Sequence, residues 1–367
     1  MHVGFTDDQQ QFREVVARFL SDKSPPTAVR EWMASDVGYD PAVWQQLSQE
    51  LGLVGIHIPE MYGGAGFGPV ELGIVSQEMG RRLYCGPFFA SAIMASHALL
   101  NADNDAVNAR LLPGIAAGEL KAALVLDDLT TADQVGHAIQ FSQNTLTGEA
   151  KLVLDAHIAD VMIVAASGER GVALYEIDPA AARVVPKEVV DPTRKLSTVT
   201  LNSVPAQLIG EAHIDQLWDQ MSVMLAHEMV GGAEQLFETT IEYMKMRVQF
   251  GRAIGSFQAL KHRCADLLLE LELAKAMTHE AARFLAGISD DVTSPNMAKA
   301  LASDAYMSIA KQAIQLRGGI GFTWEEDTHL WFKRAKASEV LLGTSNWHRE
   351  RMIMRLEQGL GEVNHGG

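Results

Sequence analysis

The residues of this chain best suited to chemistry lie between Arg247 and Gln258. Arg247 closes a long helix-like run, glycines then mark a turn, and Phe257 and Gln258 open the next helical run. An arginine is a permanent cation, and its planar fork of donors suits phosphate oxygens. Further on, the Gly318-Gly319 pair lets the backbone approach a flat or anionic group closely. These residue types in this order suit a ligand that carries phosphate.

Each of these residues also has an ordinary structural explanation. Arg247 fits the cap of a helix C-terminus, where a cation is favoured by ~0.3–1 kcal/mol. Gly318-Gly319 fits a helix stop. The histidines show neither the HExxH pattern nor paired metal spacing, so they are interpreted as surface or packing residues and no metal site is predicted. The combination of Arg247 with the downstream segments is what favours a ligand site.

The elements that must position these residues fall into three regions, 1–121, 122–210 and 211–367. Helical periodicity dominates the first, short apolar runs between turn residues fill the second, and long helical segments fill the third. The expected strands are Ala122–Leu126, Thr145–Leu154, Val161–Ala165, Val172–Ile177, Arg183–Val185 and Thr198–Leu201. The expected long helices are Asp215–Arg247, Phe257–Ile288, Ser294–Leu316 and Lys333–Leu356. We predict an α+β chain with an N-terminal helical domain, a small antiparallel β domain in the middle and a C-terminal four-helix bundle.

Composition argues against several classes of protein. Hydrophobic residues make up 47% and charged residues 21% of the 367 residues, which fits a globular chain of two or three domains. The net charge of -16 argues against a nucleic-acid surface, which needs a dense basic face. No apolar run is long enough to span a bilayer, and the polar, acidic first residues do not form a secretory signal. With Cys85 and Cys264 as its two cysteines, the chain is expected to be cytoplasmic, without disulfides or membrane contact.

The sequence resembles those of the acyl-CoA dehydrogenase family over nearly the whole chain. The specific part of the resemblance is Arg247–Gln258 followed by Gln315–Phe322 and Gly343-Thr344. Asp191–Arg194 and Gly319–Glu325 are similar to segments of members that act on steroid side chains and related bulky acyl-CoA esters. The resemblance implies the family's fold. It also implies FAD-dependent α,β-dehydrogenation of an acyl-CoA thioester, in lipid or steroid side-chain catabolism.

The resemblance further implies which residues hold FAD. In the family, the residues matching Arg247 and Gln258 hold the pyrophosphate and nearby atoms across a subunit interface. The segment matching Gln315 to Gly319 lies along the adenosine half. The full set of expected cofactor contacts is Arg247, Phe250, Gln258, Gln315, Gly318, Gly319, Thr344, Ser345 and Asn346. Since each flavin then needs two chains, the implied assembly is a dimer of dimers, a homo- or heterotetramer with another acyl-CoA dehydrogenase chain. Electron-transfer flavoprotein is the implied electron acceptor.

The base that removes the α proton of the substrate is the missing part of this pattern. The family places a carboxylate either just before the Gly-Thr of the C-terminal segment or early in the helix that ends at Arg247. These positions are Leu342 and, by our count, Met221, and neither side chain accepts a proton. Glu228 follows Met221 by two helical turns on nearly the same apolar face, which makes it the candidate base. A salt bridge to a neighbouring helix is a somewhat favoured alternative for such an acid.

Three hypotheses follow for the function. In the first hypothesis, the chain is an active FAD-dependent acyl-CoA dehydrogenase with a displaced base at Glu228. Alternatively, it is a non-catalytic partner subunit that supplies the flavin-binding Arg247 to a second chain carrying the base, which suits a sequence that lacks acids at both usual positions. The third hypothesis is a flavin-free scaffold that retains the fold alone.

Overall fold

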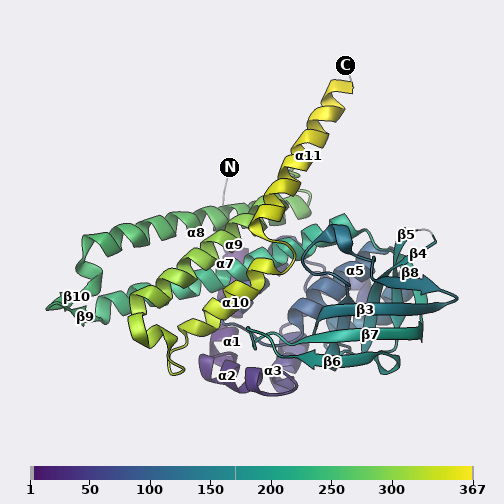
Figure 1. Ribbon diagram of the computed structural model, residues 1–367, viewed down its shortest axis with the longest axis horizontal. Coiled ribbons are helices and arrows are strands. Elements are labelled where there is room, and N and C mark those ends of the chain that lie inside the picture. Colours follow the sequence, from purple (N-terminus) through teal and green to yellow (C-terminus); the bar gives the residue numbers. More distant parts are fainter. Residues whose placement is uncertain (1–3, 170, 366–367) are drawn as a thin grey trace. The chain divides into compact units, whose positions relative to one another are not determined.

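The computed structural model describes residues 4–169 and 171–365, which form two compact units (Figure 1). The first unit contains the residues up to Thr27, the segment Gly73–Tyr84 and the residues from Ser222 onward. The second unit contains Ala28–Leu72 and Cys85–Met221. Both units are discontinuous in sequence. The three-domain division with boundaries after residues 121 and 210 therefore remains a prediction, although secondary structure does change close to both boundaries.

The second unit is built on a sheet that has eight strands within the described residues. The strands are β1 (Ala122–Val125), β2 (Ile139–Ser142), β3 (Thr145–Leu154), β4 (Val161–Gly168), β5 (Gly171–Ile177), β6 (Arg183–Lys187), β7 (Leu196–Pro205) and β8 (Gln207–Glu211). Their order is β6-β7-β3-β2-β4-β5-β8, and β1 pairs with β4. Alternation along the strands buries one set of side chains in an apolar core that includes Ile139, Leu146 and Val199.

The predicted strands are all present, but their arrangement differs from the prediction in one respect. β1 pairs with β4 in parallel, and so does β2 at the single pair Gln140–Ser167, so the sheet is mixed and not purely antiparallel. β2 and β8 are additional strands of four and five residues.

Helices surround this sheet within the second unit. They are α2 (Pro26–Ala34, whose first two residues belong to the first unit), α3 (Pro41–Gln45), α5 (Ser96–Asn101), α6 (Asp105–Ala116), the π-helices η1 (Gln46–Glu50) and η3 (Phe88–Ala95), and the 3-10 turns η2 (Glu60–Tyr62), η4 (Ala132–Gln134), η5 (Ala156–Ile158) and η6 (Pro179–Ala181). The side chains of η3 are all buried. One of them, Ser91, accepts a hydrogen bond from the backbone N–H of Ala122 at 3.1 Å, which ties η3 to β1.

The first unit is a bundle of long helices. They are α1 (Asp7–Lys23), most of α4 (Pro69–Arg81), most of α7 (Ile214–Met246), α8 (Gln258–Leu285), α9 (Ser294–Arg317), α10 (Thr328–Val340) and α11 (Ser345–His365), with the small strands β9 (Val248–Gln249) and β10 (Arg252–Ala253) and the 3-10 turns η7 (Ile254–Ser256) and η8 (Gly318–Phe322). Glycines let α4 and α7 approach closely. A Cβ at Gly231 would lie 1.8 Å from the carbonyl oxygen of Gln77, so no larger residue fits there.

The last predicted helix, Lys333–Leu356, is wrong as a single element. The structure divides it into α10 and α11 at a turn where Leu342 has φ +58° and Gly343 has φ +102°. Both angles lie in the left-handed region, which an α-helix cannot continue through. The glycine at 343 tolerates this conformation, and the Leu342 backbone is held in it by contacts described below.

A single buried carboxylate, Glu234 on α7, joins four helices of the first unit. It accepts hydrogen bonds from Arg13 of α1 at 3.2 Å, Gln77 of α4 at 2.8 Å and Arg81 of α4 at 3.2 Å, and it forms an ion pair with Lys275 of α8 at 2.8 Å. Burial works to raise the pKa of Glu234, but the Lys275 ammonium and the two guanidinium groups outweigh it and hold the pKa below the usual value. The carboxylate is therefore charged in the folded protein.

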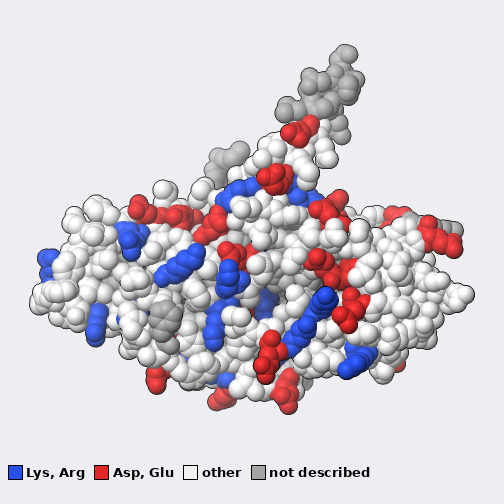
Figure 2. Space-filling model, viewed as in Figure 1, with Lys and Arg blue, Asp and Glu red and all other residues white. Residues whose placement is uncertain are grey.

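The surface drawn in Figure 2 carries acidic and basic side chains interspersed over the same face. No helix within residues 4–169 and 171–365 is long and apolar enough to cross a membrane.

We expect Glu234→Gln to lower the free energy of unfolding by about 3 kcal/mol at neutral pH, because the three cations would lose their shared carboxylate. Because the folded pKa of Glu234 is depressed, its stabilisation is present above the unfolded value of about 4.3 and is lost as pH falls through the folded pKa. The variant should therefore show a flatter pH dependence of stability in acid. Urea unfolding from pH 7 to pH 3 measures both effects.

Glu238→Gln is the matched control. Glu238 also pairs with Arg81, at 2.6 Å, but its side chain is 55% exposed. This variant should change stability by less than about 1 kcal/mol. Equal losses for the two variants would contradict the role given to Glu234.

Candidate functional site

The predicted cofactor residues of the α7–β9–β10 segment lie on the open surface of the first unit. Arg247 follows the last residue of α7, is exposed, and makes no side-chain ion pair within the described part of the chain. β9 and β10 form a hairpin in which Arg252 faces Gln249, and Phe250 at its tip is 91% exposed with φ +52°. An aromatic ring this exposed at a strained turn is more readily explained by a ligand or a partner chain than by packing within the chain.

Gln258 and Gln315 come to the same end of the bundle because α8 and α9 run side by side. Gln258 is the first residue of α8, and Gln315 lies in the last turn of α9. The guanidinium of Arg263 on α8 donates to the side-chain oxygen of Gln312 on α9 at 2.9 Å, which fixes the two helices together near this end. Figure 1 shows the β9–β10 hairpin at this end of the bundle.

The glycine pair after α9 also lies at this end. Gly318 has φ +63°, and a Cβ at either Gly318 or Gly319 would meet nothing within 4 Å, so the backbone there faces open space. The residues at this end are called the hairpin-end set from here on. The set consists of Arg247, Phe250, Gln258, Gln315, Gly318 and Gly319.

The other expected cofactor residues, Thr344, Ser345 and Asn346, form the start of α11. The Thr344 hydroxyl accepts a hydrogen bond from the backbone N–H of Trp347 at 3.3 Å, so Thr344 caps this helix. Thr344 and Asn346 are exposed. His348, one turn further along α11, lies 3.1 Å from the side chain of Asn296. Asn296 is in the first turn of α9, so the start of α11 lies at the opposite end of α9 from the hairpin-end set.

The separation between the two groups can be estimated from α9. Asn296 and Gln312 mark its two ends and are 16 residues apart, which corresponds to about 24 Å along the helix axis. One chain therefore holds the two halves of the expected contact set far apart. This arrangement supports the expectation that each flavin is contacted by two chains.

Leu342, at one of the two usual positions of the base, is fully buried in the turn between α10 and α11. The buried ammonium of Lys299 on α9 organises this turn. It donates to the carbonyl oxygens of Ser338 at 3.1 Å and Gly343 at 3.0 Å, and to the hydroxyl of Ser303 at 3.1 Å. These bonds satisfy carbonyl groups at the end of α10 that the helix itself leaves unpaired.

His348 holds the same turn from its other side. Its Nε2 lies 2.8 Å from the carbonyl oxygen of Leu342, and its Nδ1 lies 3.1 Å from the side chain of Asn296. Burial first, and then the charge of Lys299, hold the pKa of His348 well below its usual value, so the ring is neutral. Nε2–H then donates to Leu342, and Nδ1 accepts. Asn296 must accordingly turn its NH2 group toward Nδ1, which gives its buried Nδ2 atom a partner.

Met221, at the second usual position of the base, is fully buried and apolar. Glu228, on the same helix, is also buried, and its Oε1 accepts a hydrogen bond from Nη1 of Arg334 on α10 at 2.7 Å. The exposures of the two side chains are 9% and 4%, so this is a buried ion pair. Glu228 therefore forms a salt bridge to a neighbouring helix, which is the alternative to a catalytic role that the sequence offers for it.

Lys299 and Asn296, which hold the Leu342 turn from α9, are absent from the sequence predictions, and His348 is covered there only by the interpretation of the histidines as surface or packing residues. Lys299 carries the one signal that could have revealed them. It stands in an alanine-rich stretch of α9, between the buried Ala298 and Ala300, where a charged side chain must find buried partners.

The described residues fit the FAD that the resemblance implies. A pyrophosphate needs a fixed cation and free donors, and the hairpin-end set offers the Arg247 guanidinium, two side-chain amides and an unobstructed glycine backbone. These groups would hold the pyrophosphate and the adenosine half. Thr344, Ser345 and Asn346 would hold the other end of a flavin.

Comparison with known proteins identifies the family of this chain. The model of the acyl-CoA dehydrogenase N-terminal domain matches residues 6–119, and that of the C-terminal domain matches residues 214–357. Acyl-CoA dehydrogenase IpdE2 of Mycobacterium tuberculosis is 36% identical over 97% of this chain and 98% of the relative. The protein of the same name from Mycolicibacterium smegmatis is 34% identical over 92% of this chain and 95% of the relative.

Solved structures with the same fold include a complex of two proteins and a butyryl-CoA dehydrogenase. The ChsE4-ChsE5 complex from Mycobacterium tuberculosis gives a TM-score of 0.89 at 23% identity, covering 97% of this chain and 99% of the matched chain. Butyryl-CoA dehydrogenase from Megasphaera elsdenii gives 0.85 at 21% identity, covering 97% and 100%. With family models at both ends and relatives above 30% identity along nearly its whole length, this chain belongs to the acyl-CoA dehydrogenase family of FAD-dependent oxidoreductases.

Proposed function

We propose that this chain is one subunit of a heteromeric, FAD-dependent acyl-CoA dehydrogenase, in which it supplies flavin-binding residues and a second chain supplies the base. The observation that carries this proposal is the pair of fully buried apolar residues, Leu342 and Met221, at the two positions where the family places its carboxylate. Removal of the α proton of a thioester needs a proton acceptor within hydrogen-bond reach. Neither side chain is one.

In this proposal, the chain supplies the cofactor-binding side of the site. The hairpin-end set is exposed and makes few contacts with its own chain, as expected of residues that serve a neighbouring subunit. When bound, FAD supplies the oxidising power that α,β-dehydrogenation requires. Arg247 would neutralise pyrophosphate charge, Gln258 and Gln315 would orient the nucleotide, and Gly318 and Gly319 would allow its close approach.

Glu228 remains the proposed base only for the alternative in which this chain is active by itself. Its ion pair with Arg334 weighs against that role. The Oε1 atom of Glu228 already accepts a hydrogen bond from the buried Arg334 guanidinium, so this oxygen is engaged within the protein and not turned toward a substrate. The pair also links α7 to α10, and this link alone explains why an acid stands on an otherwise apolar face.

The relatives suggest the class of substrate and the partners. A variant of the Tcur3481-Tcur3483 steroid ACAD shares the fold, with a TM-score of 0.88, and so does the ChsE4-ChsE5 complex. We propose an acyl-CoA ester from steroid or lipid catabolism as the substrate of the assembly and electron-transfer flavoprotein as its electron acceptor. We propose a tetramer with another acyl-CoA dehydrogenase chain, located in the cytoplasm.

The flavin content of the purified protein tests this proposal. The chain alone should be colourless, and its complex with the acyl-CoA dehydrogenase chain encoded beside it should show a bound flavin absorption band. In that complex, Arg247→Met should weaken FAD binding about tenfold or more, because a charge-assisted contact to the pyrophosphate is lost. Titration of the apo-complex with FAD measures the change.

Lys245→Met is the control for Arg247→Met. Lys245 is an exposed cation two residues earlier, paired with Glu242 on the same helix, and its replacement should leave FAD affinity unchanged. A chain that binds stoichiometric FAD by itself and turns over substrate would contradict the partner role. A complex that stays colourless would instead favour the flavin-free scaffold.

The role of Glu228 is tested by the variants Glu228→Gln, Arg334→Met and their combination. Arg334→Met leaves a buried carboxylate without its cation and should lower the free energy of unfolding by about 3–5 kcal/mol, and the double variant should regain part of that loss. Turnover by the complex should stay within about threefold for Glu228→Gln, since a structural pair takes no part in the reaction. A loss of 100-fold or more in kcat (about 2.7 kcal/mol) with stability preserved would instead identify Glu228 as the base.

A further inference from the structure

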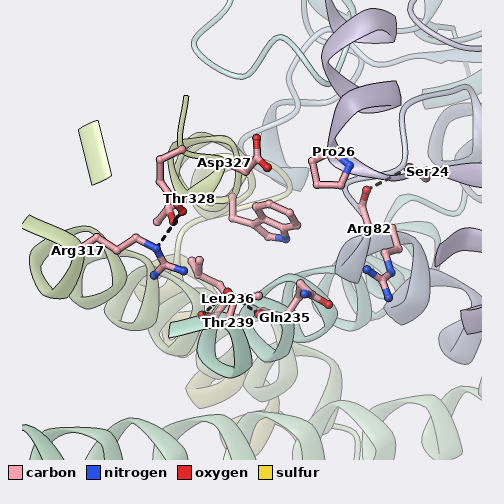
Figure 3. A pocket seen from close by; sticks show the side chains of 11 residues that line it. Ser24, Pro26, Arg82, Gln235, Leu236, Thr239, Arg317, Asp327 and Thr328 are labelled. Atoms are coloured by element: carbon pink, nitrogen blue, oxygen red, sulfur yellow. Dashed lines mark hydrogen bonds and ion pairs between the residues drawn. The ribbon is translucent and has the colours of Figure 1, made fainter. Parts of the chain in front are cut away.

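A cavity of about 170 Å³ lies in the first unit, lined by residues that the proposed dehydrogenase site does not use. Its lining residues come from α7 and α10, from the residues just after α1 and α4, from the first residue of α2, and from the end of α9 and the segment that follows it. Figure 3 shows Arg82 and Arg317 on opposite sides of this cavity, with Gln235, Leu236 and Thr239 of α7 between them. A cavity of about 150 Å³ holds a molecule of the size of benzene, so this one has room for about six or seven non-hydrogen atoms.

One wall of the cavity contains a hydrogen-bond donor without a partner. Trp331, in the first turns of α10, is 8% exposed, and its indole Nε1 is buried with no acceptor in the described structure. An indole N–H is a donor only, and leaving it buried and unpaired costs about 1–3 kcal/mol. Buried tryptophans usually have a partner for this group. A ligand with an acceptor group in the cavity would supply one.

Arg82 places a half-buried guanidinium beside the cavity. Its neighbour Arg81 is fully engaged with Glu234 and Glu238, whereas Arg82 makes no ion pair with any carboxylate of the described residues. Burial, and then repulsion from Arg81, lower the pKa of Arg82, and the charges of Glu78 and Glu238 offset this only in part. Its backbone is held in place by Ser24, whose hydroxyl donates to the Arg82 carbonyl oxygen at 3.2 Å.

The hydrogen-bond donors on the opposite wall already have partners within the protein. Arg317 donates from Nε to Glu326 at 3.0 Å and from Nη1 to the hydroxyl of Thr240 at 2.8 Å. Thr328 donates to the same Glu326 carboxylate at 2.7 Å. The Asp327 carboxylate also lines the cavity and has lone pairs to accept further hydrogen bonds. This wall therefore offers acceptor capacity and little free positive charge.

We propose that this cavity binds a small monocarboxylate that also carries a hydroxyl group. The carboxylate would lie against Arg82, the Gln235 amide and Trp331, and the hydroxyl would donate to Asp327. One uncompensated guanidinium suits a single negative charge. Two carboxylates on the facing wall oppose a dianion such as phosphate, and the volume limits the ligand to a chain of about four carbons.

Binding of sodium 3-hydroxybutyrate, sodium butyrate and inorganic phosphate to the full chain in its natural complex tests this proposal. Calorimetric titration should give saturable binding of 3-hydroxybutyrate at millimolar concentrations, about fivefold weaker binding of butyrate, which lacks the hydroxyl, and none of phosphate. Arg82→Gln should weaken binding of 3-hydroxybutyrate at least tenfold. Trp331→Phe, which keeps the aromatic volume and removes the N–H, should weaken it about fivefold.

Two control variants accompany these. Trp324→Phe changes a tryptophan that is 60% exposed and outside the cavity, and Arg110→Gln changes an arginine of the other unit that pairs with Glu176. Both should bind 3-hydroxybutyrate as the unchanged protein does. Circular dichroism melting confirms that each variant is folded, and Arg82→Met, which also removes the charge, replaces Arg82→Gln if the latter unfolds.

The proposal is overturned if neither carboxylate binds saturably, if phosphate binds more tightly than 3-hydroxybutyrate, or if folded Arg82 and Trp331 variants bind as tightly as the controls. A crystal grown with 3-hydroxybutyrate that shows only ordered water in the cavity overturns it as well. None of these outcomes depends on flavin or on turnover, so the result is independent of the proposed dehydrogenase function.

Discussion

The first unit depends on one buried charge, the Glu234 carboxylate. A charge removed from water is tolerated only when hydrogen bonds and opposite charges replace its hydration, and Glu234 obtains these from three other helices. The donors reach it from α1, α4 and α8, so each of these helices must dock on α7 in one register. Apolar packing alone would tolerate small shifts along the helix axes, whereas a carboxylate with several fixed donors would not.

This constraint has consequences at both candidate sites. Because α8 is held on α7 and α9 is held on α8, the hairpin-end set and the start of α11 lie at fixed positions at opposite ends of the bundle. The same carboxylate engages Arg81 and leaves the adjacent Arg82 without a counter-charge. Two neighbouring arginines, the last residue of α4 and the residue after it, thus have different positions, one in the packing of the bundle and one beside the cavity.

The sequence predicts those parts of the fold that rest on local periodicity and local motifs. Strand β3 is predicted to the residue, because ten residues of alternating and β-branched character end at turn signals on both sides. The break between α10 and α11 is missed, since Leu342 carries no local signal for a left-handed conformation and is held there by Lys299 and His348. Glu234 and the residues around the cavity are missed for the same reason: they acquire their roles from residues far away in the sequence. The predicted cofactor residues can be recognised as a motif, while their division between two ends of the bundle emerges only from the three-dimensional arrangement.

The turn around Leu342 explains how a chain of this family can lack the base and keep its fold. Lys299 and His348 bind backbone carbonyl groups of this turn, and neither contact involves the side chain at position 342. An apolar residue therefore satisfies the turn and fills a fully buried position, where an unpaired carboxylate would be costly. This turn determines where α11 begins. Thr344 caps the helix there, and Ser345 and Asn346 follow it as the first residues of the helix. The start of α11 therefore keeps its place without a proton acceptor at position 342, which is what the proposed division of cofactor binding and proton abstraction between two subunits requires.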